Sequence, residues 1–580
     1  MPAASQRFFS FHFHRNIKST SKALLILLIG STYSVCAGAD TILDTMEKEQ
    51  KRAMKALAKD DDAPYFISYE IREIKQISMN ALFGATMQAV KRHERILTVD
   101  LHVGSYQFDN TRQIRTNNAP AAQTLNLQTR INLPMDDSQQ SLQSILWRET
   151  DKKFREAKSM LARVRTSEGI SVDLEDNSGD FSKEKPENYV GDFSELNASE
   201  EQWQQRLRTY TKVFKNDPNI LQARANYDAL IETRWLVNTE GTKIRDVSPQ
   251  YRLIIIATTR AEDGMALPRY ASFFARDPSR LPDDTTILAE VKQMVTDLAA
   301  LRDAPVVEPY TGPAILIGRA SAVFFHEVFG HRIEGHRQKN VNEGQTFTSK
   351  LDTSILPDNF SVYFDPNLQE LAETPLAGYY QFDNQGVRGK RVDAVQHGKF
   401  QNFLMSRTPI EGFPNSNGHG RSQLGFQPVA RQSNLVVEVE NSLSTAQLKD
   451  RLIQLVKEQG KPYGLIFVDI EGGFTLTGRT IPNAFNVTPI MVYRIYPDGK
   501  EELVRGVDLI GTPLTAFSKV VAADDQLGVF NGMCGAESGQ VPVSAVSPGI
   551  LLSQIEVQRK QIPQQSLPIL PPPLSSLDKK

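Results

Sequence analysis

A short run near the middle of the chain has the residue types of a metal-dependent catalytic site. Residues 326–331 read His-Glu-Val-Phe-Gly-His, so that two histidines lie five residues apart and a glutamate follows the first. Neutral imidazoles are good zinc ligands, and a carboxylate beside one of them is placed to take a proton from a metal-bound water. The sequence therefore predicts a metal site at His326 and His331 with Glu327 as general base. The alternative is a helix that only carries polar residues on its outer face.

The element that must position these residues is a helix. A mostly apolar run, Ile315–Phe325, leads into the motif. On a regular helix, which turns by about 100° per residue, this spacing puts the two imidazoles roughly 140° apart. Both can bind one ion only if the helix is bent or loosened between them. Gly330 is the residue that tolerates such a distortion at low cost.

A third ligand is available from Cys534, in the glycine-rich segment 528–540. The thiolate is the metal-binding form of cysteine, and glycines let the segment turn tightly toward another part of the chain. Two histidines and a cysteine, with water in the fourth position, make an open zinc shell of the catalytic type. The alternatives are a buried cysteine without a role and an intermolecular link.

Residues 1–39 have the pattern of a secretory signal peptide. Four basic residues come first, the apolar run 23–30 follows, and Ala-Gly-Ala at 37–39 supplies the small residues of a cleavage site. We therefore predict an exported protein, either periplasmic or secreted. The alternative interpretation of the apolar run is a membrane anchor, for which it is short.

The mature chain has the composition of a soluble protein. Removing the leader takes away four basic residues and no acidic one, so the formal net charge falls from −2 to −6, which argues against nucleic acid as a partner. No other stretch has 18 consecutive apolar residues, so no membrane span is expected after leader removal. Of the two cysteines, Cys36 leaves with the leader, and no internal disulfide is expected.

We predict an α+β protein of two domains. Residues 40–304 form the N-terminal α+β domain, with an acidic loop at about 167–200 that is expected to be solvated surface. Residues 305–560 have many short strands between glycine turns, which indicates a β-rich, barrel-like domain that carries the metal-site helix. Residues 561–580 are a flexible, proline-rich tail.

Local signals place two elements within these domains. A hairpin is expected to turn at Glu240-Gly241 in the first domain. A helix is expected over Ser444–Gln459 in the second, with Gly460 as its cap.

Several separated blocks resemble the TldD/PmbA family of metallopeptidases. They occur in the family's order and are 326–335, Phe-Asp-Asn-Gln-Gly at 382–386, Asn-Gly-His-Gly-Arg at 417–421, and the Asn-Gly-Met-Cys-Gly block at 531–535 with Gln-Val-Pro-Val at 540–543. Arg234 with Asn-Thr-Glu-Gly-Thr at 238–242 resembles the family's first domain.

The resemblance implies a two-domain protein that dimerises and holds one Zn²⁺ per chain through His326, His331 and Cys534. It implies Glu327 as general base and the cleavage of small or unfolded peptides, which lie as an added, extended strand. The His-Glu-x-x-x-His motif is that of the catalytic, TldD-like member. The dimer partner is then either a second copy or a non-catalytic relative.

Five further polar residues are candidates for supporting roles. Glu334 lies three residues past the second histidine and is expected to orient a neighbouring ligand rather than bind metal itself. His336 stands where the resemblance predicts an acidic residue, so it is an alternative ligand. His419 and Arg421 lie in a glycine loop suited to contacting substrate, and Asp383 lies in a turn. The alternative for these three residues is a polar turn.

Two other functions compete with peptide hydrolysis. One is an exported, non-catalytic peptide-binding or assembly protein with the same fold, against which the presence of Glu327 argues, because binding needs no general base. The other is a structural zinc site in which His336 or Glu334 closes the shell.

Overall fold

The computed structural model describes residues 40–112, 130–168, 176–340, 343–479 and 484–560. The predicted leader and the proline-rich tail lie outside these residues, as does part of the acidic stretch. Among the described residues, no helix is both long and apolar enough to span a membrane.

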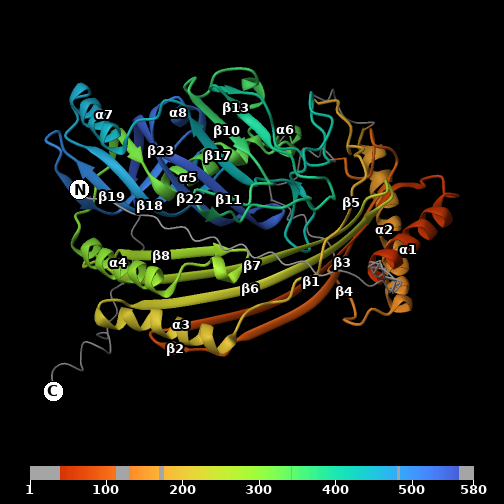
Figure 1. The fold of residues 1–580 in the computed structure, drawn as a ribbon. Helices are drawn as coiled ribbons and strands as arrows, with labels where there is room; N and C mark the ends of the chain where they lie inside the picture. The colour runs from red at the N-terminus through yellow and green to blue at the C-terminus, as the bar shows by residue number, and fades with distance from the viewer. Residues whose placement is uncertain (1–39, 113–129, 169–175, 341–342, 480–483, 561–580) are drawn as a thin grey trace, which may run out of the picture. The chain divides into compact units, whose positions relative to one another are not determined.

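An eight-stranded sheet occupies the N-terminal part of the chain (Figure 1). Its strands follow the order β4-β3-β1-β6-β7-β5, with β2 on β1 and β8 on β7. The neighbouring strands β6 and β7 form the predicted hairpin, and Gly241 in its turn has a φ of 103° that favours glycine. The strands are β1 (Pro64–Leu82), β2 (Ala85–Thr86), β3 (Val90–Val103), β4 (Ile131–Asn132), β5 (Asn188–Val190), β6 (Gln222–Asn238), β7 (Lys243–Arg260) and β8 (Ala266–Ala275).

Four helices bury the apolar side chains of this sheet. α1 (Thr41–Leu57) and α2 (Gln139–Glu168) share a core with β1, β3 and β6. α3 (Glu200–Lys212) and α4 (Asp284–Asp303) share a second core with β6, β7 and β8, and Figure 1 shows both lying along these strands. Helices segregated on an antiparallel sheet are what the predicted α+β class requires.

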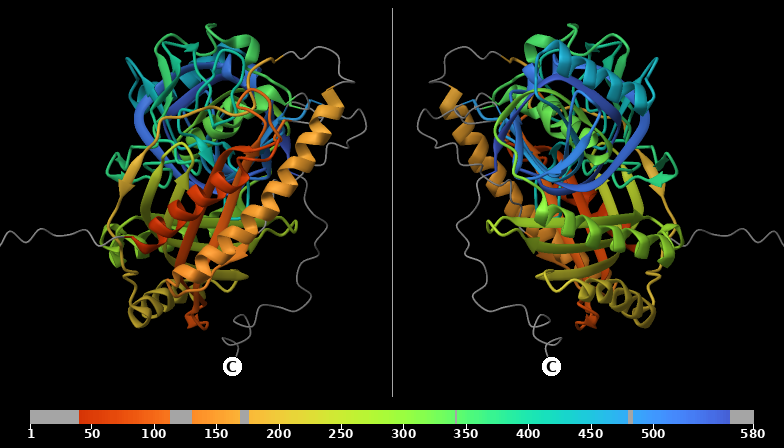
Figure 2. Two further views of the ribbon diagram at one scale, coloured as in Figure 1. Left: turned by 90° about the vertical axis from the view of Figure 1, so that its right-hand side faces the viewer. Right: turned by 90° about the vertical axis from the view of Figure 1, so that its left-hand side faces the viewer.

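An eleven-stranded sheet forms the C-terminal part, and five of its strands close into a ring. The ring runs β9-β18-β19-β21-β23 and closes because β23 also pairs with β9, which confirms the predicted barrel-like architecture. The later strands of the ring, coloured blue, curve round in both views of Figure 2. The ring strands are β9 (Tyr310–Leu316), β18 (Gly464–Thr475), β19 (Phe485–Ile495), β21 (Val507–Gly511) and β23 (Gly539–Arg559).

The remaining strands of this sheet extend from the ring. The path continues from β23 through β17 (Asn434–Val439), β10 (Phe360–Phe364), β13 (Val392–Gln396) and β14 (Lys399–Phe400), while β20 (Glu501–Val504) pairs with β19 and β22 (Val520–Ala536) pairs with β23. Two small sheets and two short helices complete this part: β11 (Glu370–Leu371), β12 (Thr374–Pro375), β15 (Gly420–Arg421), β16 (Val429–Ala430), α7 (Thr445–Glu458) and α8 (Pro513–Phe517).

Helix α5 (Gly318–Val328) follows the ring strand β9 directly and packs against β18, β22 and β23. Phe324, Phe325 and Phe329 join the main C-terminal core and contact Phe517 of α8. Every residue from Ala320 to Val328 is buried. The apolar run therefore fixes α5 in the core, and the polar residues at its end are held with it.

The acidic stretch is not solvated surface at its centre, where Asp180, Phe181 and Ser182 are buried. Phe181 stacks on His102 at 4.2 Å between ring centroids. The guanidinium carbon of Arg407 lies 4.0 Å from the centroid of the Phe181 ring. The Ser182 amide donates to the Arg407 carbonyl at 2.8 Å. The expectation from composition is therefore wrong here, because one aromatic side chain anchors the segment between the two parts of the chain.

The buried His102 beside Phe181 is held by two carboxylates, and this arrangement makes a prediction about stability. Its Nδ1 is 2.6 Å from Asp109 and its Nε2 is 3.2 Å from Asp100. Burial alone would lower the pKa of His102, but the two carboxylates outweigh it and raise the pKa to about 10. Asp109→Asn should cost about 3 kcal/mol of unfolding free energy at pH 6, because it leaves a buried imidazolium short of one partner.

The way in which the stability deficit of Asp109→Asn changes with pH follows from the raised pKa of His102 and the lowered pKa of Asp109. A raised folded-state pKa contributes stability fully below about pH 6.5 and loses it as the pH rises toward 10, so the deficit of Asp109→Asn should shrink over that range. It should also vanish as the pH falls through the lowered pKa of Asp109. Urea unfolding at pH 6 and pH 9 measures the stability deficit, and Asp61→Asn, at an exposed position, is the control. A deficit that does not change with pH would contradict the prediction.

Candidate metal centre

The structure brings the three predicted ligands together from three elements. His326 lies near the end of α5, His331 lies in the 3₁₀ helix η3 (Gly330–Ile333), and Cys534 lies near the end of β22. One ligand atom from each falls within 4.8 Å of the others, and all three side chains are buried. The Cys534 Sγ is 3.2 Å from His331 Nε2, and the two imidazole rings are 5.0 Å apart.

The backbone changes between the two histidines, as their spacing requires. α5 ends at Val328, and the tighter η3 begins at Gly330. Gly330 is also required by packing, since a Cβ there would lie 2.0 Å from Gln432 Oε1. Gln432 in turn donates from Nε2 to the His326 carbonyl at 3.3 Å, so this glutamine fastens the end of α5.

The side chains present fit a metal ion. His326 Nδ1 is buried without a hydrogen-bond partner among the described residues, so no protein group occupies it. Burial alone would raise the pKa of Cys534, but His331 and Arg431 outweigh it and hold the pKa well below its usual value. Two imidazoles and a thiolate within reach of one point form a donor set for zinc or a similar ion.

Glu327 lies beside these ligands and is itself largely buried, with 7% of its surface exposed. Burial raises the pKa of its carboxyl, and this effect outweighs the opposing influence of the two histidines. Gly473 of β18 lies against it, because a Cβ at that position would come within 2.8 Å of Glu327 Cγ. The strand can therefore approach the carboxylate closely only with glycine there.

Glu334 and His336 lie close to the ligands in sequence, and each is paired with charged side chains. Glu334 is fully buried, 3.3 Å from His331 Nδ1 and 2.9 Å from Arg337 Nε. Burial alone would raise its pKa, but His331 and Arg337 outweigh it and bring the pKa to about 2. His336, in α6 (His336–Lys339), is paired through Nε2 with Glu537. Glu334 therefore lies where it orients an imidazole, whereas His336 is paired with Glu537 and is not one of the three residues whose ligand atoms converge.

Asp383, His419 and Arg421 are buried and hold the loops around them rather than the ligands. Asp383 accepts backbone hydrogen bonds from Gln385, Val387 and Gly420, and burial raises its pKa to about 6. His419 contacts Asn417 and Ser433, and Arg421 donates to the Gln432 carbonyl at 2.5 Å. A contact of these three residues with substrate stays a prediction.

Sequence reasoning missed Arg431 and Gln432, which lie directly behind the ligands. Arg431 is fully buried and donates from Nη2 to the Cys534 carbonyl at 2.6 Å and to its Sγ at 3.2 Å. Neither residue belongs to a recognisable motif, so only the folded chain reveals them.

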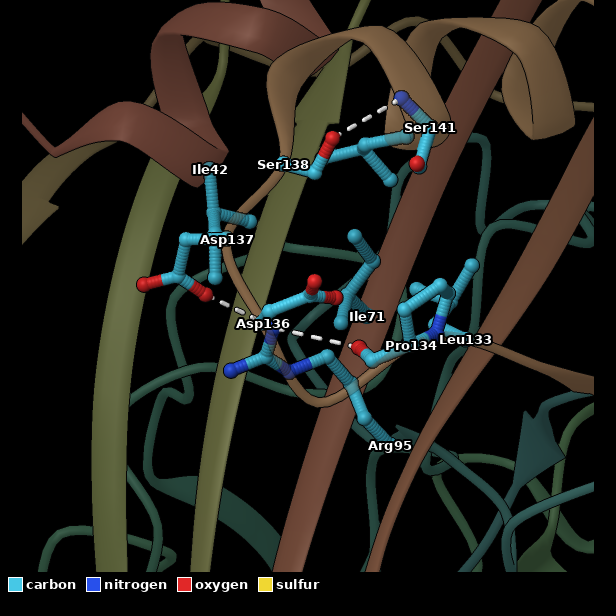
Figure 3. Close-up of a pocket in the computed structure, with 10 residues that line it drawn as sticks. Ile42, Ile71, Arg95, Leu133, Pro134, Asp136, Asp137, Ser138 and Ser141 are labelled. Atoms are coloured by element: carbon cyan, nitrogen blue, oxygen red, sulfur yellow. Dashed lines mark hydrogen bonds and ion pairs between the residues drawn. The ribbon is translucent and has the colours of Figure 1, made fainter.

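A hollow in the N-terminal part, shown in Figure 3, has a different character. Arg95 crosses it and donates to Asp137 Oδ1 at 2.8 Å and to the Pro134 carbonyl at 3.5 Å. Its Nη2 also meets Glu73 at 2.5 Å. These contacts tie the segment before α2 to β3, which indicates a structural role.

Comparison with known proteins identifies the C-terminal part. Residues 309–559 match the family model of the PmbA/TldA metallopeptidase C-terminal domain. A protein of Saccharolobus solfataricus named zinc metalloprotease TldD homolog is 22% identical over 250 residues, which are 42% of this chain and 51% of that protein. Residues 309–559 therefore form a C-terminal domain of the TldD/PmbA type. The three candidate ligands, His326, His331 and Cys534, lie inside the matched residues.

A second relative and a solved structure are also similar to this chain. A protein of Archaeoglobus fulgidus named metalloprotease is 28% identical over 232 residues, which are 40% of this chain and 49% of that protein. The chain thus spans about half the length of the curated relatives it matches. The crystal structure of TldE from Thermococcus kodakarensis shares the fold, with a TM-score of 0.58 at 13% identity over 89% of this chain and 100% of that one. The names of the relatives imply a bound metal and a peptidase family.

Proposed function

We propose that this protein is a zinc-dependent peptidase that hydrolyses small or unfolded peptides. The observation that carries the proposal is the cluster of His326, His331 and Cys534 with Glu327 at its side. Imidazole and thiolate ligands favour zinc over the hard cations that prefer oxygen. A fourth position on a bound metal would be left to solvent or substrate, because Glu334 and His336 are engaged with other side chains. An open position of this kind is typical of catalytic rather than structural sites.

A metal held by these ligands would supply a Lewis acid that polarises the scissile carbonyl and activates water. Glu327 is the group of this chain that moves the proton. Its raised pKa suits a carboxyl that accepts a proton from the attacking water and then delivers it to the leaving amine. The buried setting also strengthens the electrostatic effects on the reacting atoms.

The substrate is proposed to bind as an extended strand along β22. This strand pairs with β23 on one side, and among the described residues its other side meets no strand beyond an isolated bridge at Asp524. A peptide added to a free edge is held through its backbone, with little selection of side chains. Phe530 and Cys534 lie on the same face of β22 by alternation, and the Phe530 ring is 6.3 Å from that of His326. A bound strand would therefore run past the ligands.

The compartment and the partner complete the proposal. The sequence of residues 1–39 supports export to the periplasm or beyond the cell. The chain is proposed to work as a dimer, with either a second copy or a non-catalytic relative, and the shared fold with TldE supports a partner of the same architecture.

Removal of the metal tests the proposal. The purified mature protein, incubated with an unstructured peptide, should release fragments, and treatment with a strong chelator followed by dialysis should abolish release. Re-addition of Zn²⁺ should restore it. A protein that binds the peptide but cleaves none of it, with or without metal, would instead have the non-catalytic binding function.

A further inference from the structure

Arg431 connects the strand that carries Cys534 to the turn that follows it. It lies in the segment that joins β16 to β17, and its side chain is fully buried. Nη2 donates to the carbonyl and to the Sγ of Cys534, at 2.6 and 3.2 Å. Nη1 donates to Ser538 Oγ at 2.8 Å and to the Gly539 carbonyl at 3.0 Å. One guanidinium therefore fixes both the sulfur and the backbone that presents it.

The same guanidinium reaches the partner of a second ligand. Arg431 Nε lies 3.5 Å from Glu334 Oε1, and Glu334 lies 3.3 Å from His331 Nδ1. His331 and Cys534 come from elements far apart in the sequence, and the Arg431–Glu334 pair links them through buried charges. Charged partners behind the ligands of a metal site orient those ligands, and their loss usually weakens metal binding.

The chemistry of arginine suits this position. A buried guanidinium is tolerated only where its N–H groups meet acceptors or negative charge, and here it meets a carboxylate, a sulfur, a hydroxyl and two carbonyls. Its planar fork of donors is rigid, so each contact fixes the others. Lysine would keep the charge but offers a single ammonium in place of the fork.

We propose that Arg431 is a positioning residue that holds the Cys534 sulfur, and through Glu334 the His331 ring, in place for the metal. The inference rests on the proposed function, because it takes these side chains as ligands. It adds a residue that the motif blocks do not contain. It also explains why a full positive charge is buried beside a cysteine.

The test is metal affinity, measured on the mature protein by competition with a chromogenic chelator. Arg431→Met should bind Zn²⁺ about 10–100-fold more weakly than wild type, and Arg431→Lys should lie between the two. With Co²⁺ in place of Zn²⁺, the thiolate-to-cobalt charge-transfer absorption should weaken in Arg431→Met. A change in stability alone would not alter that absorption in the folded fraction.

Arg407→Met is the matched control. Arg407 is as deeply buried as Arg431, but it pairs with Glu240 and the Ser182 carbonyl. Its replacement should lower the thermal midpoint and leave Zn²⁺ affinity and the cobalt absorption at wild-type values. The comparison separates the loss of a buried arginine from the loss of a ligand's support.

Wild-type affinity and an unchanged cobalt absorption in folded Arg431→Met would overturn the inference. If that variant does not fold, wild-type values in Arg431→Lys would overturn it equally. The readouts do not depend on peptide turnover, so a wild-type protein that binds metal without cleaving peptides would refute the proposed function and leave this inference standing. Metal retained by Cys534→Ala would refute the ligand set itself.

Discussion

Replacing Glu327 by glutamine should lower kcat for peptide hydrolysis by about 10²–10⁴-fold and leave the bound metal in place. Glutamine has nearly the size of glutamate but no basic oxygen that takes up a proton. Glu327 is largely buried, and burial raises the pKa of its carboxyl, which favours holding the proton between attack of water and departure of the amine. Because it is not one of the three proposed ligands, metal content should stay at the wild-type level.

A nearby carboxylate provides the control for this substitution. Glu343 Oε1 accepts from Arg337 Nη1 at 3.0 Å, and Glu343→Gln makes the same change of charge without touching the ligands. Its kcat on the same unstructured peptide should stay within a few-fold of wild type. If Glu327→Gln hydrolyses the peptide as fast as the wild-type protein, Glu327 is not the general base and the mechanism proposed here is wrong.

Much of the fold follows from short-range signals. The predicted helix Ser444–Gln459 is α7, where Ser444 and Gln447 form a capping box and Gly460 has a φ of 61°. The hairpin at Gly241 follows equally from its turn residues. Such signals depend on neighbours in the chain, which the sequence displays directly.

Long-range pairing does not follow in the same way. The ring closes because Leu316 of β9 meets Ile550 of β23, and nothing near either residue specifies the other. In the acidic stretch, average composition predicts exposure at Phe181, whereas this single aromatic side chain anchors the segment on His102 and Arg407. Contacts of this kind depend on where distant strands come to lie.

In the candidate site too, some residues are recognisable from the sequence and others only from the folded chain. His326 and His331 are recognisable from their spacing, and Cys534 from its glycine neighbours. The spacing of the histidines predicts Gly330 for its backbone freedom, and the side chain of Gln432 also excludes any larger residue there. Arg431 carries no spacing or composition signal, because its role arises only when its side chain comes to lie against Cys534 and the turn at Ser538.

The second large effect is expected from the third ligand. Cys534→Ala should weaken metal binding by more than about 10²-fold, beyond the range seen for residues that lie behind a ligand. Alanine removes the sulfur that lies 3.2 Å from His331 Nε2 and leaves two imidazoles, which are too few donors for a closed or catalytic zinc shell. Metal content after dialysis against a chelator measures the loss, and peptide hydrolysis should disappear with the metal.

His336→Ala is the matched control and also the decisive alternative. His336 lies two residues beyond Glu334 and is paired with Glu537, so its removal should change one ion pair and leave metal content near that of wild type. The opposite pattern, with metal kept by Cys534→Ala and lost by His336→Ala, would make His336 the third ligand. In that case the His336 side chain would have to leave Glu537 and turn toward His331 when metal binds. The Glu537 carboxylate would keep a cationic partner, because Arg337 lies 2.9 Å from it.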